Sequence, residues 1–334
     1  MINISQSIRI LRARSAAFCL GACVAALVAG TGPASAQEYP MRPVRILVGQ
    51  SAGGGTDLLA RLLGDKLSQA WKQPVIVENR PGASGVIAMD AVAKAPADGY
   101  TLGMLIFNHV TFEPMSKRPP YRIEKDLEPI IWLSRQSNIL VVSPSLPVTT
   151  VRELIDHLKA NPGKVSFASG GAGSPAHVAA ELFKQQTGVD MVHVPYKGAA
   201  PAMQDLMAGI VPVMFAAAPV ALPLIRDGRL RALGVTSDTR SPQTPDLPSL
   251  AESGLHYDVR DWQGVVGPAG LPPATLSRIN ADIQQVLNMP DVQSRIAAIG
   301  GEVTGGPPAR FAQHLRDEAV KWERVVREAG ITID

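Results

Sequence analysis

An α/β fold in which parallel sheets are flanked by helices is predicted by three observations on this sequence. Apolar runs of strand length alternate with segments of helical periodicity beyond residue 40. A glycine-rich loop twice follows a strand and opens a helix, at 49–57 and 167–177. The 334 residues are 46% hydrophobic and 18% charged, which suffices for one large or two ordinary domains. This alternation is typical of folds that bind ligands at the carboxyl ends of their strands.

The same alternation sets the order of the elements. Strands are predicted at 44–48, 75–78, 101–106, 139–142, 165–168, 191–194, 211–215 and 230–236. Helices are predicted between them, near 56–70, 84–94, 149–160, 175–187, 199–208 and 218–227. Proline-containing joints separate several of these elements, at 80–82, 161–163 and 241–248. A final helix is indicated by apolar residues at helical spacing and a glycine stop signal, namely Phe311, Leu315, Trp322, Val326 and Gly330.

The first 36 residues have the layout of a secretory signal peptide. They contain a basic region without acidic residues, an apolar run and a small-residue site, at Arg9, Arg12 and Arg14, at 16–29, and at Ala34 to Ala36. We therefore expect export to the periplasm with cleavage after Ala36. An uncleaved membrane anchor and a lipoprotein cut before Cys23 are the alternatives. The apolar run is short for a span of roughly 20 residues.

Cleavage after Ala36 changes the charge and thiol content of the chain. It removes Cys19 and Cys23 and leaves 29 of the 32 basic residues against 29 acidic ones. A chain without cysteine suits an oxidising compartment when its core is large enough to need no disulfide. The balanced charge argues against a nucleic-acid partner.

The two glycine-rich loops are candidate anion sites. Free N–H groups at a helix start and the positive end of the helix dipole favour a negative ligand, and small residues let it approach the main chain. In the second loop Pro175 suits the first helical turn. Each loop can also be explained as a tight turn, and both explanations stay open at this point. Asp57 likewise is either a first-turn residue that favours the helix dipole or a ligand contact.

The second loop also resembles a dinucleotide-binding fingerprint. Gly171, Gly173 and Ala176 follow the G-x-G-x-x-A spacing, and Asp190 lies nineteen residues after Gly171. An exported NAD-dependent reductase is therefore the alternative from the enzyme class. The absence of a recognisable second mononucleotide-binding half weakens it.

The sequence gives little evidence for other kinds of catalytic site. The six histidines form no HExxH or other close metal pair, and the chain has no G-x-S-x-G elbow and no phosphate-binding P-loop. Ser174 and His177 lie three residues apart at a helix start. We interpret Ser174 as a cap or ligand contact and His177 as a hydrogen-bonded helix residue. We expect neither catalysis, nor a metal, nor a cofactor.

Eight sequence words resemble one known family and span nearly the whole exported chain. They are YPxRPVRI (39–46), AGGxxD (52–57), VxVENRPGASG (75–85), AKAPADGYTL (93–102), SxGxGSxxH (169–177), HVPYKG (193–198), APAMQDL (200–206) and WxGxxxPAG (262–270). With these words the chain resembles the Bug-type extracytoplasmic solute receptors, which are the periplasmic binding proteins of tripartite tricarboxylate transporters.

The resemblance implies a fold, a function and a set of partners. The fold is a type II periplasmic binding protein, a Venus flytrap of two α/β lobes joined by crossing hinge strands. Lobe 1 would comprise 37–138 and 237–334, and lobe 2 would comprise 139–236. The protein would be a monomer that captures a small organic carboxylate and delivers it to the membrane permease subunits. A sensor of the same fold without a transport role is a further alternative.

The resemblance also implies which residues contact the solute. Ala52, Gly53 and Gly54 on one lobe, and Ser169, Gly171, Gly173 and Ser174 on the other, would present N–H and hydroxyl donors to the carboxylate. We further expect solute contacts from Gln50, Asp57, Asn108, His177 and Ala216. Asn108 and Ala216 belong to two segments, 106–109 and 216–219, that would line the variable wall of the site, and their side chains are too few to define the solute.

Four positions depart from the family pattern. Gln50 replaces a common aromatic residue, Glu113 a common Asn, and Lys117 a common Tyr. Ala216 replaces a frequent Asp that suits an amine or hydroxyl group on the solute. Gln50 and Ala216 together suggest altered specificity for a solute without an amino group.

Overall fold

The computed structural model describes residues 39–298 and 300–332. Arg42–Asp334 forms one compact unit. The predicted signal peptide, its cleavage site and both cysteines lie outside the described residues. No helix in the described ranges is both long and apolar enough to cross a membrane.

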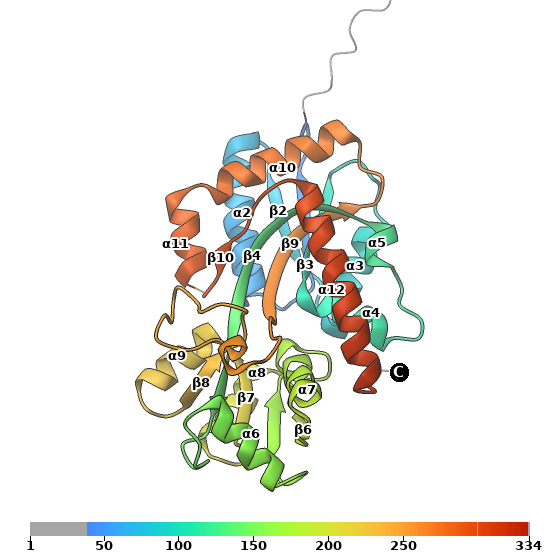
Figure 1. Ribbon diagram of the computed structural model, residues 1–334. Coiled ribbons are helices and arrows are strands. Elements are labelled where there is room, and N and C mark those ends of the chain that lie inside the picture. The colour runs from blue at the N-terminus through green and yellow to red at the C-terminus, as the bar shows by residue number, and fades with distance from the viewer. Residues whose placement is uncertain (1–38, 299, 333–334) are drawn as a thin grey trace, which may run out of the picture. The chain divides into compact units, whose positions relative to one another are not determined.

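Two groups of strands share one long strand (Figure 1). Sheet A, as we name the first group, contains β1 (Val44–Val48), β2 (Val75–Asn79), β3 (Thr101–Ile106), β9 (Arg260–Pro268), β10 (Glu302–Val303) and the first part of β4 (Leu127–Val142). Sheet B contains the end of β4 together with β5 (Ser166–Ser169), β6 (Val192–Pro195), β7 (Val213–Ala217) and β8 (Arg231–Val235). Both sheets are mixed.

The parallel pairs are those that carry the strand–helix–strand units predicted from the sequence. They are β1 with β2 and β3, and β5 with β6 and β7. Strands β9 and β4 pair antiparallel with their neighbours, so the expectation of purely parallel sheets is wrong at the centre. The antiparallel pairs arise because β4 and β9 pass between the two parallel groups instead of following a crossover helix.

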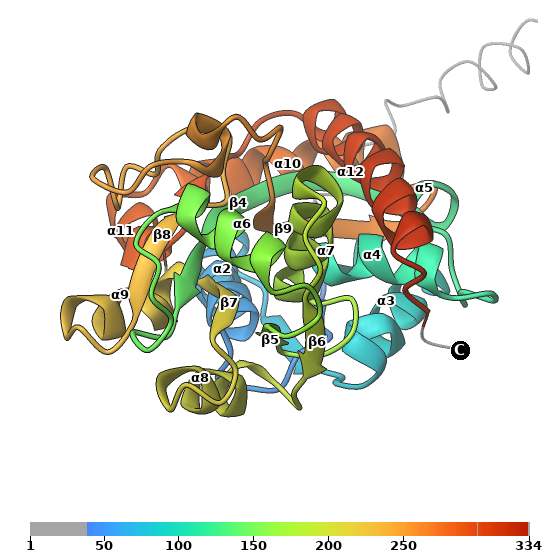
Figure 2. The same cartoon turned by 60° about the horizontal axis from the view of Figure 1, so that its bottom comes forward.

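Helices cover both sheets (Figures 1 and 2). The longer helices of the sheet A side are α2 (Gly55–Trp71), α3 (Val86–Ala93), α4 (Phe107–Met115), α10 (Pro273–Leu287), α11 (Pro290–Ala298) and α12 (Pro308–Glu328). Those of the sheet B side are α6 (Val151–Ala160), α7 (Pro175–Thr187), α8 (Ala199–Met207) and α9 (Ala218–Arg226). The short ones are η1 (Ala83–Gly85), α5 (Ile123–Asp126) and η2 (Leu250–Ser253).

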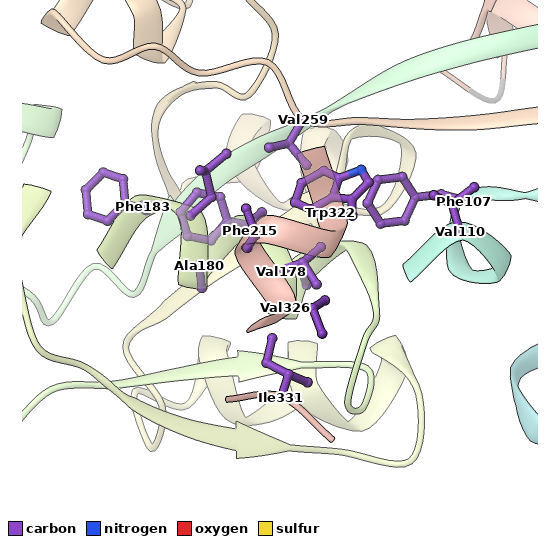
Figure 3. Close-up of a cluster of buried hydrophobic side chains, with 14 of the residues drawn as sticks. Phe107, Val110, Val178, Ala180, Phe183, Phe215, Val259, Trp322, Val326 and Ile331 are labelled. Carbon is purple, nitrogen blue, oxygen red and sulfur yellow. The ribbon is translucent and has the colours of Figure 1, made fainter. Parts of the chain in front are cut away.

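The core runs from one sheet side to the other along α12. Trp322 and Val326 of α12 lie between Phe107 of α4 on one side and Val178 and Phe215 of the sheet B side on the other (Figure 3). The rings of Phe107 and Trp322 meet edge to face with centroids 5.0 Å apart. All five side chains are at most 2% exposed, so α12 holds both sheet sides against one apolar surface.

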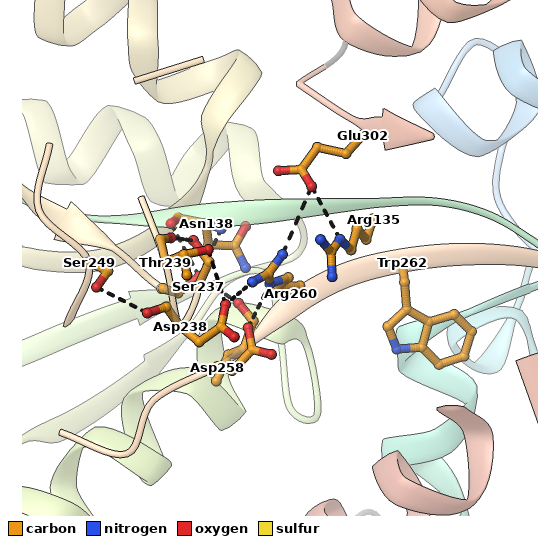
Figure 4. Close-up of polar contacts among 12 residues, drawn as sticks. Arg135, Asn138, Ser237, Asp238, Thr239, Ser249, Asp258, Arg260, Trp262 and Glu302 are labelled. Carbon is orange, nitrogen blue, oxygen red and sulfur yellow. Dashed lines mark hydrogen bonds and ion pairs between the residues drawn. The ribbon is translucent and has the colours of Figure 1, made fainter. Parts of the chain in front are cut away.

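The crossing between the sheets is held by backbone bonds and an arginine cluster. Thr236, which is fully buried, exchanges bonds with Asn138, and its hydroxyl donates to the carbonyl of Val259. Nearby, Arg260 of β9 contacts three acidic residues, Asp238, Asp258 and Glu302 (Figure 4). Asp238 follows β8 of sheet B and Glu302 belongs to β10 of sheet A, so this cluster ties the two sheets at their junction.

Candidate functional site

The first glycine-rich corner connects β1 to α2. Gly54 is the N-cap residue of α2 and has no side chain to offer the first turn, and the loop residues 51–55 are exposed. The first N–H groups of a helix have no partner within the helix. The start of α2 therefore presents main-chain donors and a positive dipole end, as predicted.

Asp57 holds this corner together. The side chain is 1% exposed, and its Oδ2 accepts from Gly53 N at 2.8 Å and from Arg61 Nε at 3.0 Å. Its Oδ1 accepts from Asn79 Nδ2 at 2.8 Å. The bond from Arg61 is the main cause that lowers the pKa of Asp57 to about 2, and the Gly53 and Asn79 bonds add to it against the opposing effect of burial. The amide of Gly53 is thus used inside the corner.

The second glycine-rich corner connects β5 to α7 and is also bonded internally. Gly171 N donates to Ser169 Oγ at 3.1 Å, and Ser174 Oγ donates to Gly171 O at 2.7 Å. Gly173 N donates to His177 Nδ1 at 3.1 Å. Because the hydroxyl of Ser174 is turned to Gly171, it does not cap α7.

Two stacked imidazoles support the second corner. The rings of His177 and His193 lie 3.7 Å apart between centroids, and His193 Nε2 lies 2.6 Å from Ser169 Oγ. Burial is the main cause that lowers the pKa of His177 to about 3 and that of His193 to about 4. Both rings are therefore neutral at physiological pH. His177 is thus a hydrogen-bonded helix residue, as predicted. The role of His193 was not predicted, because its only signal in the sequence is its place in the HVPYKG word.

Ser169 and His193 do not form an accessible nucleophile pair. Ser169 is fully buried, and its hydroxyl already contacts Gly171 O at 3.1 Å. The serine therefore serves the loop that follows it.

On the sheet A side a third histidine repeats the arrangement of His177. His109, fully buried in the first turn of α4, accepts from Ile106 N through Nδ1 at 3.0 Å. Burial lowers its pKa to about 4. A Cβ on Gly85 would lie 2.6 Å from His109 Nε2 and 2.9 Å from Gln50 Nε2, and Gly85 has φ +98°, so only glycine fits between these side chains.

A cavity of about 320 Å³ lies between the second corner and the sheet A side. Its lining joins elements distant in the sequence, namely Ala83, Ser84, Asn108, Phe112, Met115, Ala172 and Gly173. Thr111 Oγ1 donates to Gly173 O at 3.0 Å and bridges the two sides beside it. Of the predicted solute contacts, Asn108 and Gly173 line this cavity. Its size is within the range of small-molecule sites.

Ala216 lies at a different kind of position. It belongs to β7, is fully buried, and packs in an apolar cluster with Ile139, Ala168 and Val235. Its contact with a solute stays a prediction.

The dinucleotide interpretation of the second corner does not fit the structure. Asp190 lies before β6, at the amino end of that strand, next to Gly163. The glycine corner follows the carboxyl end of the parallel neighbour β5. Asp190 and the corner therefore lie at opposite ends of the strands of sheet B, so Asp190 cannot contact a nucleotide held at the corner. The described part of the chain also contains no group of three or more His, Cys, Asp or Glu side chains placed to hold a metal.

The chain is similar to known solute receptors. Residues 59–331 match the model of the tripartite tricarboxylate transporter family receptor. Protein BugT of Bordetella pertussis is 38% identical over 301 residues, which cover 89% of this chain and 92% of that protein. An R. palustris protein solved with adipate is 36% identical, with a TM-score of 0.78 over 88% of this chain and 99% of that one. MatC from Rhodopseudomonas palustris, solved with bound malate, is 30% identical, with a TM-score of 0.74 over 86% and 100% of the two chains.

Proposed function

This chain belongs to the tripartite tricarboxylate transporter receptor family, and on that premise we propose that it captures a small organic carboxylate in the periplasm and delivers it to a membrane permease. The predicted two-lobe α/β fold is confirmed by the solved relatives. The observation that carries the proposal is that relatives covering almost the whole chain hold adipate and malate, both small carboxylates.

We propose the lobe boundaries given by the resemblance, 37–138 with 237–334 for lobe 1 and 139–236 for lobe 2. Their support is the change of partners along β4. Residues 127–137 of β4 pair with β9 of sheet A, and Asn138 to Val142 pair with β7 of sheet B. The crossings at Asn138 and Thr236 then act as the hinge on which the lobes close.

The proposed carboxylate contacts are the main-chain donors at the starts of α2 and α7. Ala52 on lobe 1, with Asn108 beside the cavity, would face the solute directly, whereas Gly54 N already donates to Ser51 O over a long 3.4 Å and would have to turn to the solute. Three glycine amides already have acceptors inside the corners, because Gly53 donates to Asp57, Gly171 to Ser169 and Gly173 to His177. These bonds would shape the corners, and each amide would contact the solute only if the solute displaces its internal acceptor. Gln50 has a buried Oε1 without a partner among the described residues, so it can receive a donor from the solute.

The proposal extends to the activity, the oligomeric state, the export and the protein partners of this chain. The family is one of receptors, and we propose that this member has no enzymatic activity, acts as a monomer and is released by cleavage after Ala36. Permease subunits would be its protein partners. Loss of solute uptake on deletion of the gene would separate transport from a purely sensory role.

A thermal-shift screen of mono-, di- and tricarboxylates tests the proposal. A ligand that binds only the folded state at a hundredfold excess over Kd stabilises it by about 2.7 kcal/mol. We expect at least one small carboxylate to raise Tm by several degrees, and NAD(H) to have no effect. The proposal is wrong if no carboxylate shifts Tm.

A further inference from the structure

We infer that Asp261 and Gln263 of β9 form the floor of the solute site and bind an ammonium group of the solute, which would make this receptor selective for an amino-substituted carboxylate. The inference rests on the proposed function. It follows from the direction in which the two side chains point, from their place at the end of β3, and from their missing partners.

One face of β9 is covered by α3 and α12. A Cβ on Gly264 would lie 2.2 Å from Phe311 of α12, and a Cβ on Gly103, two residues before its partner Leu105, would lie 2.7 Å from Met89 of α3. Side chains alternate between the two faces of a strand. Gln263 and Asp261 therefore point to the opposite face.

The opposite face is the one covered by α2. Gly64 of α2 packs on Val77, and Val77 is in register with Ile46 and, through it, with Leu102 of β3. Leu102 lies on the same face of β3 as Ile106, the partner of Gln263. Since α2 begins at the first glycine corner, Asp261 and Gln263 lie on the face from which that corner rises.

Asp261 lies beyond the carboxyl end of β3. The pairing of β3 with β9 ends at Ile106 and Gln263, and Asp261 is two residues further along β9, towards sheet B. This is the edge of a parallel group at which ligands bind. On its other side Asp261 is paired with Gln136 of β4, whose Nε2 donates to Asp261 Oδ2 over a long 3.4 Å.

Both side chains lack a partner for a buried oxygen. Asp261 Oδ1 and Gln263 Oε1 are shielded from solvent, and neither has a hydrogen-bond partner within the described ranges. No cation among the described residues pairs with Asp261, since the adjacent Arg260 points to the other face and contacts Asp238, Asp258 and Glu302 (Figure 4). Burial raises the pKa of Asp261 to about 6, so the carboxyl group is still ionised above neutral pH.

Asp261 and Gln263 are half-buried, but a carboxylate oxygen shielded from solvent without a cation is costly, and an unsatisfied amide oxygen beside it adds to the cost. An ammonium group would remove both costs, because it brings a positive charge and three N–H donors. A plain dicarboxylate would instead bring only further negative charge next to Asp261. This inference replaces the expectation, drawn from Gln50 and Ala216, of a solute without an amino group, because Asp261 supplies an acid from β9.

Isothermal titration calorimetry at pH 7.5 with three matched pairs of acids tests the inference. The pairs are succinate and aspartate, glutarate and glutamate, and adipate and 2-aminoadipate. At the chain length that binds best, we expect the amino acid to bind about 10- to 100-fold more tightly than its plain partner. In Asp261→Asn this preference should disappear, because the amino acid loses its counter-charge and the plain acid no longer faces an ionised carboxylate. Gln263→Leu should reduce the preference by a smaller factor.

Asp317→Asn is the matched control, because it removes an exposed carboxylate from α12 and should keep the preference. The inference is overturned if plain acids bind wild type as tightly as their amino partners, or if the preference survives in Asp261→Asn. Tighter binding of malate than of aspartate also contradicts it, because malate offers a hydroxyl group only. In these cases the proposed function stands. If none of these acids binds wild type, the inference fails, and the proposed carboxylate function fails with it only if no acid of the thermal-shift screen raises Tm either.

Discussion

The two glycine-rich corners have the same backbone arrangement and differ in the residue that accepts the glycine amide. Each follows a parallel strand, opens a helix without a side-chain cap and donates a glycine amide to a residue four positions later, Asp57 in one and His177 in the other. The acceptor is an ionised carboxylate paired with Arg61 at the first corner and a neutral imidazole stacked on His193 at the second. A glycine-rich helix start of this kind can therefore be held by a negatively charged or by a neutral acceptor.

The comparison implies that removing Asp57, the acceptor of the first corner, lowers the free energy of unfolding more than removing the acceptor of the second corner. Asp57→Ala leaves Gly53 N and Asn79 Nδ2 without their acceptor and Arg61 without its ion pair. We expect the free energy of unfolding to fall by about 2–4 kcal/mol. Urea unfolding measures it. Asp65→Ala, which removes an exposed carboxylate from the same helix, should stay within about 0.5 kcal/mol of wild type. Equal values for the two variants would show that Asp57 does not hold the corner.

The second largest difference between the corners is expected when a glycine of each is replaced by alanine, which adds a methyl group. Gly53 and Gly173 both have positive φ, +85° and +71°, so alanine strains the backbone at each by about 1 kcal/mol. At Gly53 no atom lies within 4 Å of the new Cβ, whereas at Gly173 it would lie 2.2 Å from Met115 Cε.

We therefore expect Gly173→Ala to weaken carboxylate binding about tenfold more than Gly53→Ala does, and Met115→Ala to restore part of the loss in the double variant. Calorimetry with the best acid from the screen measures both. A loss at Gly173 that Met115→Ala leaves unchanged would assign the whole effect to backbone strain.

Acid should weaken the second corner before the first. The pKa of His177 and of His193 falls from 6.5 in the unfolded chain to about 3 and about 4, so the unfolded chain binds more protons below pH 6.5. Their contribution to stability is complete above pH 6.5 and is lost as the pH falls towards 3–4. That of Asp57 is complete above pH 3.8 and is lost as the pH falls towards 2.

Unfolding free energies measured between pH 7.5 and 4 should therefore decrease with acid, by up to about 1.4 kcal/mol per pH unit for each histidine that titrates. His109 and His314 share this direction, because burial lowers the pKa of each to about 4. The slope should be smaller in His177→Gln than in wild type. An identical slope in the two proteins would remove His177 from this account.

Local pattern predicted the parallel parts of the fold well and the crossing strands poorly. All eight strands expected from apolar runs are present, with shifts of a few residues. Residues 127–138 of β4, all of β9, and the helices α4, α10 and α11 were missed. Four polar residues interrupt the apolar pattern of the crossing strands at the junction of the two sheets, namely Arg135, Gln136, Arg260 and Asp261. Their partners lie more than 100 residues away, beyond the reach of any window of sequence.

By itself the sequence determined the order of strands and helices, the two helix starts that suit an anion, and the family. Each depends on the identity of neighbouring residues, such as glycine before a helical run. Only the tertiary structure decided which amides are already bonded and which acids lack a partner. Asn79 reaches Asp57 from 22 residues away, and His193 reaches Ser169 from 24. Asp261 is left without a cation because strand alternation turns Arg260 to the other face of the sheet. A hydrogen-bond partner is set by distance in space, and folding alone brings such residues together.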